Sequence, residues 1–561
     1  MDILFYLAAF FVLIIFFGYQ SIIYKKNTRE KLLFKLNKQW GSSPDKDYSA
    51  TAFLRIRKYF DIVKNDKFVD EITWNDLGMD NIFKSLNYTQ SSIGEDCLYN
   101  RLRSMDYSEE DLLEFDRLVS YFQENKDVCI KFQEIFANIG QTKSISVYEV
   151  IHLLGDLDNR KNTKHFALAA MLIAAIGSIF ISPPFGIIAT ITMVVINVLQ
   201  YYKSKSKIEN YFICCGYLVG LIVNAKKIAD VSDSQLSQYN MEIEEIYKKI
   251  SVITKNIFLM GTNNMSGSLA DMVMEYVRML FHVDLIKFNS VKRKATENIK
   301  EIDRLYSLVG YIESACSVAY YRQYLKEKYS VWCKPDLTQE KLGIVADDIY
   351  HPLLDNPVSN TIKEERGVLL TGSNASGKST FLKTIGINCV LAQTIYTSSA
   401  KCFRINRCLV YSSMSLKDDL TNNESYYMVE IKALKRIIDA AKSGEKIICF
   451  VDEVLRGTNT VERVSASTEI LKSFAESQMN NVLCFAATHD IELTYLLDSY
   501  YANYHFEEEI KNDDVLFNYI LNVGPATSRN AIQLLKVMGY DDKIVSMAKD
   551  RADKFMETGQ Y

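Results

Sequence analysis

Uncharged runs of apolar residues form the strongest pattern at the start of the chain. Residues 3–24 contain no charged side chain, which is long enough for one helix to cross a bilayer. Basic residues follow at once, so the positive-inside rule predicts that the chain continues in the cytoplasm. A cleavable signal peptide is the rival interpretation, but Met1 and Asp2 supply no basic start and no small-residue cleavage site follows. We therefore expect residues 1–24 to form a transmembrane anchor with its N-terminus outside.

A second uncharged run covers residues 166–202 and has basic residues on both sides. Pro183 and Pro184 divide it, because a helix does not readily continue through proline. Two short spans joined there would form a transmembrane hairpin over residues 161–204 with both ends in the cytoplasm. A helical hairpin buried in a large soluble domain would give the same pattern. No acidic or basic residue lies inside the three predicted spans, which is typical of anchors rather than of an ion or substrate pathway.

The segments before and after the hairpin have helical periodicity and few helix breakers. Residues 25–160 predict a cytoplasmic helical core segment, clearest over residues 80–103, and residues 205–335 predict the long helices of a core and lever region. Basic side chains within residues 272–324 are spread around the predicted helix and alternate with acidic ones. This spacing favours a solvated lever helix, while a stripe that contacts phosphates is the alternative.

A glycine-containing loop, TGSNASGKST at residues 371–380, follows a short apolar strand and precedes a helical pattern. Its two glycines allow consecutive backbone N–H groups to converge on an anion at a helix N-terminus. Lys378 would reach the β- and γ-phosphates of ATP, and the Ser379 hydroxyl would bind Mg²⁺. A turn that matches by chance is the alternative, and the order of strand, loop and helix disfavours it. The residues of this loop predicted to bind ATP are Gly372, Ser373, Asn374, Ala375, Ser376, Gly377, Lys378, Ser379 and Thr380.

Two further apolar runs, at residues 447–451 and 482–487, predict buried parallel strands. Ligands of open α/β sheets bind at the carboxyl ends of the strands, so the residues that follow each run are candidates for chemistry. Asp452 would hold Mg²⁺ through water, and Glu453 would polarise the attacking water. His489 would contact the γ-phosphate or orient water, and a histidine that only caps the strand end is the alternative. The predicted catalytic residues are Lys378, Glu453 and His489, and the predicted metal ligands are Ser379 and Asp452.

Composition limits the classes of function. At 561 residues the chain is too long for one core, and its net charge of -4 argues against a generic polyanion binder. The 11 cysteines form no C-x-x-C pair, and Cys214 and Cys215 are adjacent. This usage predicts reduced cytosolic thiols and no zinc site.

Three motifs together resemble the nucleotide-binding domain of the MutS mismatch-repair family. They are the phosphate loop, DEVLRGTNT at residues 452–460 and ATHDIELT at residues 487–494. The phosphate loop alone would also suit transporter or chromosome-maintenance ATPases, whereas the other two motifs narrow the resemblance to MutS-like proteins. The resemblance is strong over about residues 340–556 and weaker over the preceding helices.

The resemblance implies an α/β P-loop nucleotide-binding domain of the ABC/MutS type over residues 336–527, after a mainly α-helical core and lever region with membrane helices. It also implies ATP and Mg²⁺ as cofactors and a homodimer in which each subunit completes its partner's site. Ser425 matches the serine that would touch the partner's γ-phosphate, with a helix N-cap as its alternative role. Residues 528–561 resemble the family's helical dimerisation element, and a helical pair packed on its own domain is the alternative.

Some positions depart from the family pattern. Ser373 stands where proline is usual, and Asn423 and Glu424 replace a glycine and an arginine beside Ser425. A MutS mismatch sensor begins with a mismatch-reading domain and a connector domain, and the predicted anchor and a short polar stretch take their place in this sequence. Mismatch reading by this chain alone is therefore not expected.

The resemblance and the predicted spans together imply a membrane-tethered MutS-like ATPase, multi-pass in the cell's inner membrane with its ATPase domain in the cytoplasm. Its ATP-driven switching would act in DNA binding or DNA repair. The alternative is a nucleotide-dependent membrane scaffold that recruits a protein partner without binding DNA. A transporter ATPase fits less well, because the spans have no polar lining and the chain has no LSGGQ-like sequence.

Overall fold

The protein forms two compact units in the computed structural model. Unit 1 comprises Met1–Lys64, Asn87–Asn100 and Arg117–Tyr321. Unit 2 comprises Asn65–Leu86, Arg101–Asp116 and Arg322–Tyr561. The residues that the structure describes are 2–157, 162–255, 269–338, 341–373, 376–414, 426–456, 458–477, 481–511, 514–526, 532, 535 and 539–558.

Unit 1 is built from helices whose apolar residues recur every three or four positions. In α7, for example, this spacing buries Cys129, Phe132, Phe136 and Ile139 on one face. Three of the helices, α5, α6 and α15, continue into unit 2. The helices that lie wholly or partly in unit 1 are α1 (Asp2–Gln39), α2 (Ala50–Val63), α5 (Ser92–Arg103), α6 (Glu109–Glu124), α7 (Lys126–Ile139), α8 (Val147–His152), α9 (Thr163–Ser178), α10 (Pro183–Lys205), α11 (Glu209–Ala229), α12 (Ser237–Ile250), α13 (Leu269–Phe281), α14 (Val283–Glu297) and α15 (Ile299–Tyr329), with 3₁₀ turns η1 (Leu153–Asp156), η2 (Ser234–Leu236) and η3 (Ser251–Ile253).

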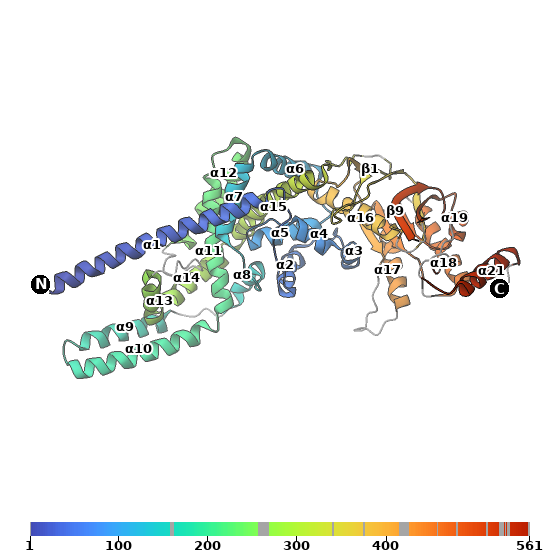
Figure 1. Ribbon diagram of the computed structural model, residues 1–561. Coiled ribbons are helices and arrows are strands. Elements are labelled where there is room, and N and C mark those ends of the chain that lie inside the picture. The colour runs from blue at the N-terminus through green and yellow to red at the C-terminus, as the bar shows by residue number, and fades with distance from the viewer. Residues whose placement is uncertain are drawn as a thin grey trace. The chain divides into compact units, whose positions relative to one another are not determined.

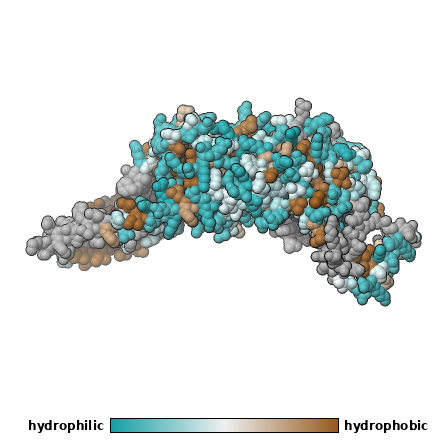
Figure 2. Space-filling model, turned by 45° about the horizontal axis from the view of Figure 1, so that its top comes forward, coloured by the Kyte–Doolittle hydropathy of each residue, from teal (hydrophilic) through white to brown (hydrophobic). Residues whose placement is uncertain are grey.

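Helices α9 and α10 form an antiparallel hairpin that projects from the rest of unit 1 (Figure 1). Pro183 begins α10, where proline is tolerated because the first N–H groups of a helix have no intrahelical partner. At the tip, Phe180 is 89% exposed and Ile181 is 88% exposed. Figure 2 shows brown, apolar surface at the lower left, where this hairpin lies. The other large apolar side chains that the hairpin exposes are Phe166, Met171, Ile173, Ile176, Phe185, Ile187, Ile188, Ile191, Val195, Ile196, Leu199 and Tyr202.

Two helices of the described residues, α10 and α11, are long and apolar enough to cross a membrane, and α9 is a shorter apolar helix. They differ in what surrounds them, because the apolar stretch of α11 is 56% buried and that of α10 is 17% buried. Burial makes α11 a core helix of unit 1, whereas the described residues leave most of the apolar surface of α10 uncovered. Helix α1 begins at Asp2, and most side chains of the predicted anchor at residues 1–24 lie outside the described ones.

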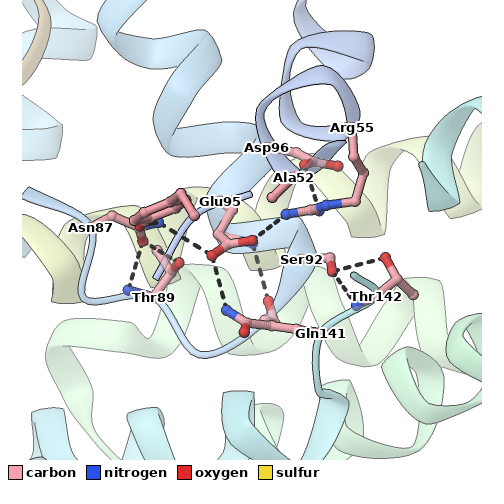
Figure 3. Close-up of polar contacts among 12 residues, drawn as sticks. Ala52, Arg55, Asn87, Thr89, Ser92, Glu95, Asp96, Gln141 and Thr142 are labelled. Atoms are coloured by element: carbon pink, nitrogen blue, oxygen red, sulfur yellow. Dashed lines mark hydrogen bonds and ion pairs between the residues drawn. The ribbon is translucent and has the colours of Figure 1, made fainter. Parts of the chain in front are cut away.

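A buried network of charged side chains connects α2, α5 and α15 within unit 1. Figure 3 shows its part around Arg55, Glu95 and Asp96. Arg55 donates to Glu95 and, at 3.1 Å, to Asp96. Lys46 donates to Glu95 at 3.2 Å, and Glu313 accepts hydrogen bonds from the backbone and hydroxyl of Ser91. Burial raises the pKa values of Asp96 and Glu313 to about 7. The network therefore sets three carboxyls against two cations, so retention of one proton brings its charge to neutral.

Unit 2 contains a six-stranded sheet in the order β5-β6-β7-β3-β8-β9 and a three-stranded antiparallel sheet in the order β2-β1-β4. Within the larger sheet, β5, β6, β7, β3 and β8 are parallel and β9 is antiparallel to β8. The parallel strands are almost fully buried, as expected for a sheet with helices on its faces. The strands are β1 (Ile344–Ile349), β2 (Asn360–Glu364), β3 (Gly367–Thr371), β4 (Cys402–Ile405), β5 (Leu409–Ser413), β6 (Ile447–Asp452), β7 (Val482–Ala487), β8 (Tyr501–Lys511) and β9 (Asp514–Val523).

Residues from the first part of the chain fold onto this sheet. Asp76 accepts hydrogen bonds from the Ser412 hydroxyl at 2.6 Å and from the Met414 backbone at 2.9 Å, beside the end of β5. Asp70 accepts from Arg436 at 2.7 Å. Unit 2 therefore includes segments that are far from its main part in the sequence. Its helices, besides the parts of α5, α6 and α15, are α3 (Glu71–Asp76), α4 (Met79–Leu86), α16 (Lys378–Ile395), α17 (Tyr426–Ala441), α18 (Thr460–Ala475), α19 (Glu492–Leu496) and α21 (Asp542–Thr558).

Two stretches with helical periodicity in the sequence are interrupted in the structure. Residues 80–103 divide into α4 and α5, because Tyr88 N–H donates to the Ser317 hydroxyl at 2.7 Å and the next backbone groups donate to Glu313. Residues 272–324 divide into α13, α14 and α15, with His282 in the left-handed region at φ 55°. These breaks depend on tertiary contacts and carry no glycine or proline signal.

Candidate nucleotide-binding site

The predicted phosphate loop lies at the carboxyl end of β3 and leads into α16. Gly372 has φ 139°, and a Cβ there would lie 2.6 Å from the Phe506 carbonyl oxygen, so a side chain does not fit. Gly377 has φ 112° and is the residue before α16 begins. The Ser376 hydroxyl is buried and has no hydrogen-bond partner among the described residues. An anion at this helix N-terminus would satisfy both that hydroxyl and the free backbone N–H groups of the first turn.

Lys378 is held at the mouth of the loop. Its Nζ donates to the carbonyl oxygens of Gly372 at 2.9 Å and Ser373 at 2.7 Å. Burial lowers the pKa of Lys378, and the nearby carboxylates of Asp452 and Glu453 oppose that shift. The ammonium therefore lies between the phosphate loop and an acidic pair, within reach of an anion bound to the loop.

Asp452 ends β6 beside the start of α16. Burial raises the pKa of the Asp452 carboxyl, while a hydrogen bond from Ser379 and the charge of Lys378 lower it. A carboxylate and a hydroxyl that lie together are the oxygen ligands that Mg²⁺ prefers in phosphate-binding sites. The two side chains therefore fit the metal role predicted for them.

Glu453 follows β6 with an uncommon left-handed backbone, φ 55°. Its N–H donates to the Ala487 carbonyl at 2.9 Å, and its side chain lines the same cleft as the loop. Glu453 Oε1 lies 3.0 Å from His489 Nε2, and Oε2 lies 2.9 Å from Arg456 Nε. Burial and the charge of Lys378 lower the pKa of His489, so its imidazole is neutral at pH 7. The carboxylate fixes the proton on Nε2, which donates to Glu453.

Buried and partly buried side chains stabilise the turns that carry Glu453 and His489. Glu430, which burial gives a raised pKa, accepts a hydrogen bond from Leu455 N–H in the turn after Glu453. Arg463 forms a two-point ion pair with Asp490, at 2.9 and 2.6 Å, directly after His489. The acidic pair and the histidine are therefore positioned by contacts outside the cleft itself.

The loop, the acidic pair and His489 line one cleft of about 460 Å³. Its opposite wall comes from the segment between β1 and β2 and from β8 and β9. Asn360, Phe506 and Tyr519 of this wall are not among the site residues predicted from the sequence. Those three come from strands whose position follows from the sheet order, so no local motif marks them. The Ser373 hydroxyl donates to Glu508 on β8 at 2.8 Å, a contact that sequence also did not indicate.

The described residues bring Ser376, Gly377, Lys378, Ser379 and Thr380 together with Asp452, Glu453 and His489 along this cleft. Gly372 and Ser373 lie directly before these residues, at the end of β3. Asn374, Ala375 and Ser425 lie outside the described residues, as does Gly457 of the DEVLRGTNT motif. The predicted C-terminal element is described at Ile532, at Leu535 and from Gly539 to the end of α21.

Comparison with known protein families gives a match for the part of the chain that contains this site. Residues 368–556 match the family profile of MutS domain V, from β3 through most of α21. Over these residues the chain has domain V of the MutS family. The MutS domain V match contains the phosphate loop, the acidic pair and His489 in one continuous stretch.

Curated MutS proteins extend the similarity at low identity. The chain is 24% identical to the DNA mismatch repair protein MutS of Fervidobacterium nodosum over 367 residues, covering 63% of this chain and 39% of that protein. It is 26% identical to MutS of Clostridium botulinum over 285 residues, covering 48% of this chain and 30% of that protein. It is 28% identical to MutS 2 of Haloarcula marismortui over 211 residues, covering 37% of this chain and 20% of that protein. The chain thus spans between 20% and 39% of the length of these relatives.

Proposed function

We propose that this chain is a membrane-tethered MutS-type ATPase in which ATP binding and hydrolysis drive a conformational switch that acts on DNA. The observation that carries the proposal is the convergence of Lys378, Ser379, Asp452, Glu453 and His489 on one cleft at the carboxyl ends of parallel strands. The names of its MutS relatives support DNA mismatch repair as the setting.

Each residue of the cleft would have a separate role in the binding and hydrolysis of ATP. The first turn of α16, the Ser376 hydroxyl and Lys378 would bind the phosphates of ATP. Glu453 would accept the proton of the attacking water, because each of its oxygens keeps a lone pair beyond its contact with His489 or Arg456. His489 holds Glu453 in place by donating from Nε2. Mg²⁺ bound by Ser379 and Asp452 would neutralise negative charge on the phosphates.

A homodimer is the assembly that the surface of unit 2 supports. Val461, at the start of α18, and Tyr495, in α19, are large apolar side chains that are largely exposed. The two helices pack on each other, and each directly follows a motif that lines or borders the cleft. Apolar residues at such positions favour a protein partner. Pairing of two cleft faces would bring Ser425 of each subunit to the site of the other.

Attachment to a membrane is supported by the hairpin of α9 and α10. Its exposed surface is apolar along both helices, and the described residues of unit 1 provide no partner that covers it. Basic residues flank both ends of the hairpin, which is typical of a cytoplasmic boundary. We place the two ends of the hairpin, and therefore the ATPase domain, on the inner face of the cell membrane.

ATP hydrolysis by the full-length protein in detergent tests the enzymatic part of the proposal. Asp452→Asn keeps the shape of the side chain but removes its charge, so the Mg²⁺ concentration that supports half-maximal hydrolysis should rise about tenfold or more. Asp498→Asn, in the turn after α19 and away from the cleft lining, is the matched control. An unchanged Mg²⁺ dependence in Asp452→Asn would remove Asp452 from the metal site.

The DNA-binding part and its alternative, a scaffold that recruits a protein partner, separate in one binding assay. Full-length protein is mixed with duplex and branched DNA at low salt, with and without ATP, because phosphate contacts are strongest when counterion release is favoured. Nucleotide-dependent DNA binding supports the switch on DNA. ATP hydrolysis without DNA binding under these conditions favours the scaffold.

Shared active sites are tested by mixing subunits. Lys378→Ala protein and Ser425→Ala protein are each combined with wild type and with each other, and hydrolysis is measured. Composite sites predict that the mixture of the two variants regains part of the activity, since one of its two sites keeps both residues. Activity that never exceeds that of the separate variants argues for independent sites.

A further inference from the structure

A cleft at the base of the hairpin is lined by charged and aromatic side chains. It lies between the C-terminal end of α10, the start of α11 and helix α13. Both α9 and α10 contact α13 there (Figure 1). The cleft measures about 490 Å³. Its lining residues are Tyr201, Tyr202, Lys205, Ser206, Glu209, Glu275, Tyr276 and Met279.

One cation is fixed in this cleft. Lys205 Nζ donates to the Tyr201 hydroxyl at 2.7 Å and lies 3.7 Å from the carboxylate of Asp284. Asp284 is only 1% exposed and also accepts from the Tyr201 hydroxyl at 2.7 Å. A buried carboxylate needs a compensating cation, so Lys205 is held at one place instead of extending into solvent.

Two carboxylates face the same cleft without such compensation. Glu209 begins α11 and Glu275 lies on α13, and both are exposed. Neither has a hydrogen bond or an ion pair with the described part of the chain. The aromatic rings of Tyr202 and Tyr276, which are 60% and 58% exposed, lie along the same opening. Acidic groups beside aromatic faces form a site for an organic ammonium ion.

The position of the cleft indicates where that ammonium ion comes from. Lys164 Nζ donates to Gln200 Oε1 at 2.8 Å, so the charged boundary of the hairpin lies one turn from Lys205 along α10. Helix α13 exposes Val273, Tyr276 and Val277 on one side, as a helix in the headgroup layer of a bilayer does. Tyrosines with one apolar and one polar end are also typical of that layer.

We propose that this cleft binds the headgroup of an ethanolamine phospholipid, with the phosphate toward Lys205 and Ser206 and the ammonium toward Glu209 and Glu275. A primary ammonium has three N–H donors, which match two carboxylates and the tyrosine hydroxyls. The apolar surface of α10 continues from the cleft and would contact the acyl chains. The inference rests on the proposed membrane insertion of the hairpin and adds to it a preference for one lipid class.

Native mass spectrometry of the full-length protein tests the inference. The protein is released from mixed micelles that contain equal amounts of phosphatidylethanolamine, phosphatidylcholine and phosphatidylglycerol, and the retained lipids are compared. We expect phosphatidylethanolamine to be retained over phosphatidylcholine by about tenfold, the effect of one charge-assisted hydrogen bond. The double variant Glu209→Gln/Glu275→Gln should lose this preference. Glu245→Gln, on an exposed part of α12, is the matched control.

Several outcomes overturn the inference. They are equal retention of the two zwitterionic lipids by the wild type, a preference that survives in the double variant, and strongest retention of phosphatidylglycerol, which would indicate general attraction to the lysines. Tyr276→Leu gives a second test, since it keeps an apolar side chain and should also weaken the preference. ATP hydrolysis by each variant reports that the protein is folded.

Flotation with vesicles of phosphatidylcholine alone separates this inference from the proposed function. Wild type and the double variant should both float, because the hairpin inserts without a particular headgroup. Flotation without an ethanolamine preference contradicts the headgroup site and leaves the membrane tether standing. Protein that stays in the dense fraction with every vesicle composition contradicts the tether itself.

Discussion

In unit 1 the buried charges of Lys46, Arg55, Glu95 and Asp96 form ion pairs with one another, whereas in unit 2 the charges of the nucleotide cleft face an opening. The polar groups of this cluster join α2, α5 and α15, and Figure 3 shows the contacts of Arg55 with Glu95 and Asp96. The cleft of unit 2 combines a buried hydroxyl that lacks a partner among the described residues with a lysine that donates to its own loop and lies 3.4 Å from Nε2 of a neutral histidine.

The difference separates two kinds of buried charge in this molecule, those that stabilise the fold and those that bind a ligand. Charges whose partners are all within the fold contribute to its stability or specificity, because removal of one partner leaves another charge buried and unpaired. Charges that converge on an opening, with polar atoms left over, belong to a ligand. The same comparison applies within unit 1, where Lys205 and Asp284 are compensated and Glu209 and Glu275 are not.

The largest effect is expected at the cleft. Lys378→Ala removes the charge that faces the phosphates and should weaken ATP binding by at least about a hundredfold, the effect of two charge-assisted hydrogen bonds. Isothermal titration calorimetry with ATP on the full-length protein measures it. Lys383→Ala, on the same helix but outside the cleft lining, should bind as wild type does. Equal weakening in both variants would show that charge on α16 matters in general and that Lys378 has no special role.

The next effect tests the buried network of unit 1. Arg55→Met leaves Glu95 and Asp96 without their main cation and should destabilise unit 1 by about 3–5 kcal/mol. Hydrogen exchange of peptides from α5 and α15 should rise, while exchange in β3 and β6 and the affinity for ATP stay unchanged. Arg57→Met, in an exposed pair with Asp61 one turn away, should cost less than about 1 kcal/mol. Similar losses of stability in the two variants would show that the buried ion pairs of Arg55 contribute no more than an exposed pair.

The two units should respond to pH with opposite signs. Burial lowers the pKa of His351 in unit 2 from 6.5 to about 4, so the folded state binds fewer protons than the unfolded state between these values. Unit 2 therefore loses up to about 3 kcal/mol as pH falls from 6.5 to 4. In His351→Asn, whose amide oxygen can still accept from Leu353 N–H as Nδ1 does at 3.3 Å, this dependence should flatten. Denaturant unfolding followed by hydrogen exchange in unit 2 measures it.

The smallest expected change in stability at neutral pH is that caused by substitution of Glu313 in unit 1. Its pKa is raised from 4.5 to about 7, so the folded state keeps a proton that the unfolded state releases, and unit 1 loses stability as pH rises from 4.5 to 7. Glu313→Gln keeps the acceptor for Gln90 and Ser91 and should change stability at pH 7 by less than about 1 kcal/mol. Its stability should fall less than that of the wild type across that range, because only Asp96 of the network then keeps a raised pKa. A slope equal to that of the wild type would locate the extra proton elsewhere.

Much of the cleft could be predicted from the sequence because its groups follow local patterns. The runs at residues 367–371, 447–451 and 482–487 are largely apolar, and each forms a buried strand. The candidate site residues lie at the carboxyl ends of these strands. Parallel pairing then brings Asp452, Glu453 and His489 to the loop without any further information.

The cleft residues and helix breaks that could not be predicted from the sequence depend on long-range contacts. Tyr519 and Asn360 reach the cleft from strands whose neighbours are set by the sheet order, and Glu508 meets Ser373 for the same reason. The breaks at Tyr88 and His282 are held by hydrogen bonds to residues more than 80 positions away, so periodicity alone predicts a helix through them. The hairpin turn, by contrast, is marked by Pro183 and was predicted.

The most direct test of the account compares single-turnover hydrolysis of bound Mg²⁺-ATP by the full-length protein with that by Glu453→Gln. The amide keeps contacts with Arg456 or His489 but cannot accept the proton of the attacking water. We expect that ATP still binds with wild-type affinity and that its cleavage slows by about a hundredfold or more. Cleavage at the wild-type rate in Glu453→Gln would contradict the assignment of this cleft as the catalytic site.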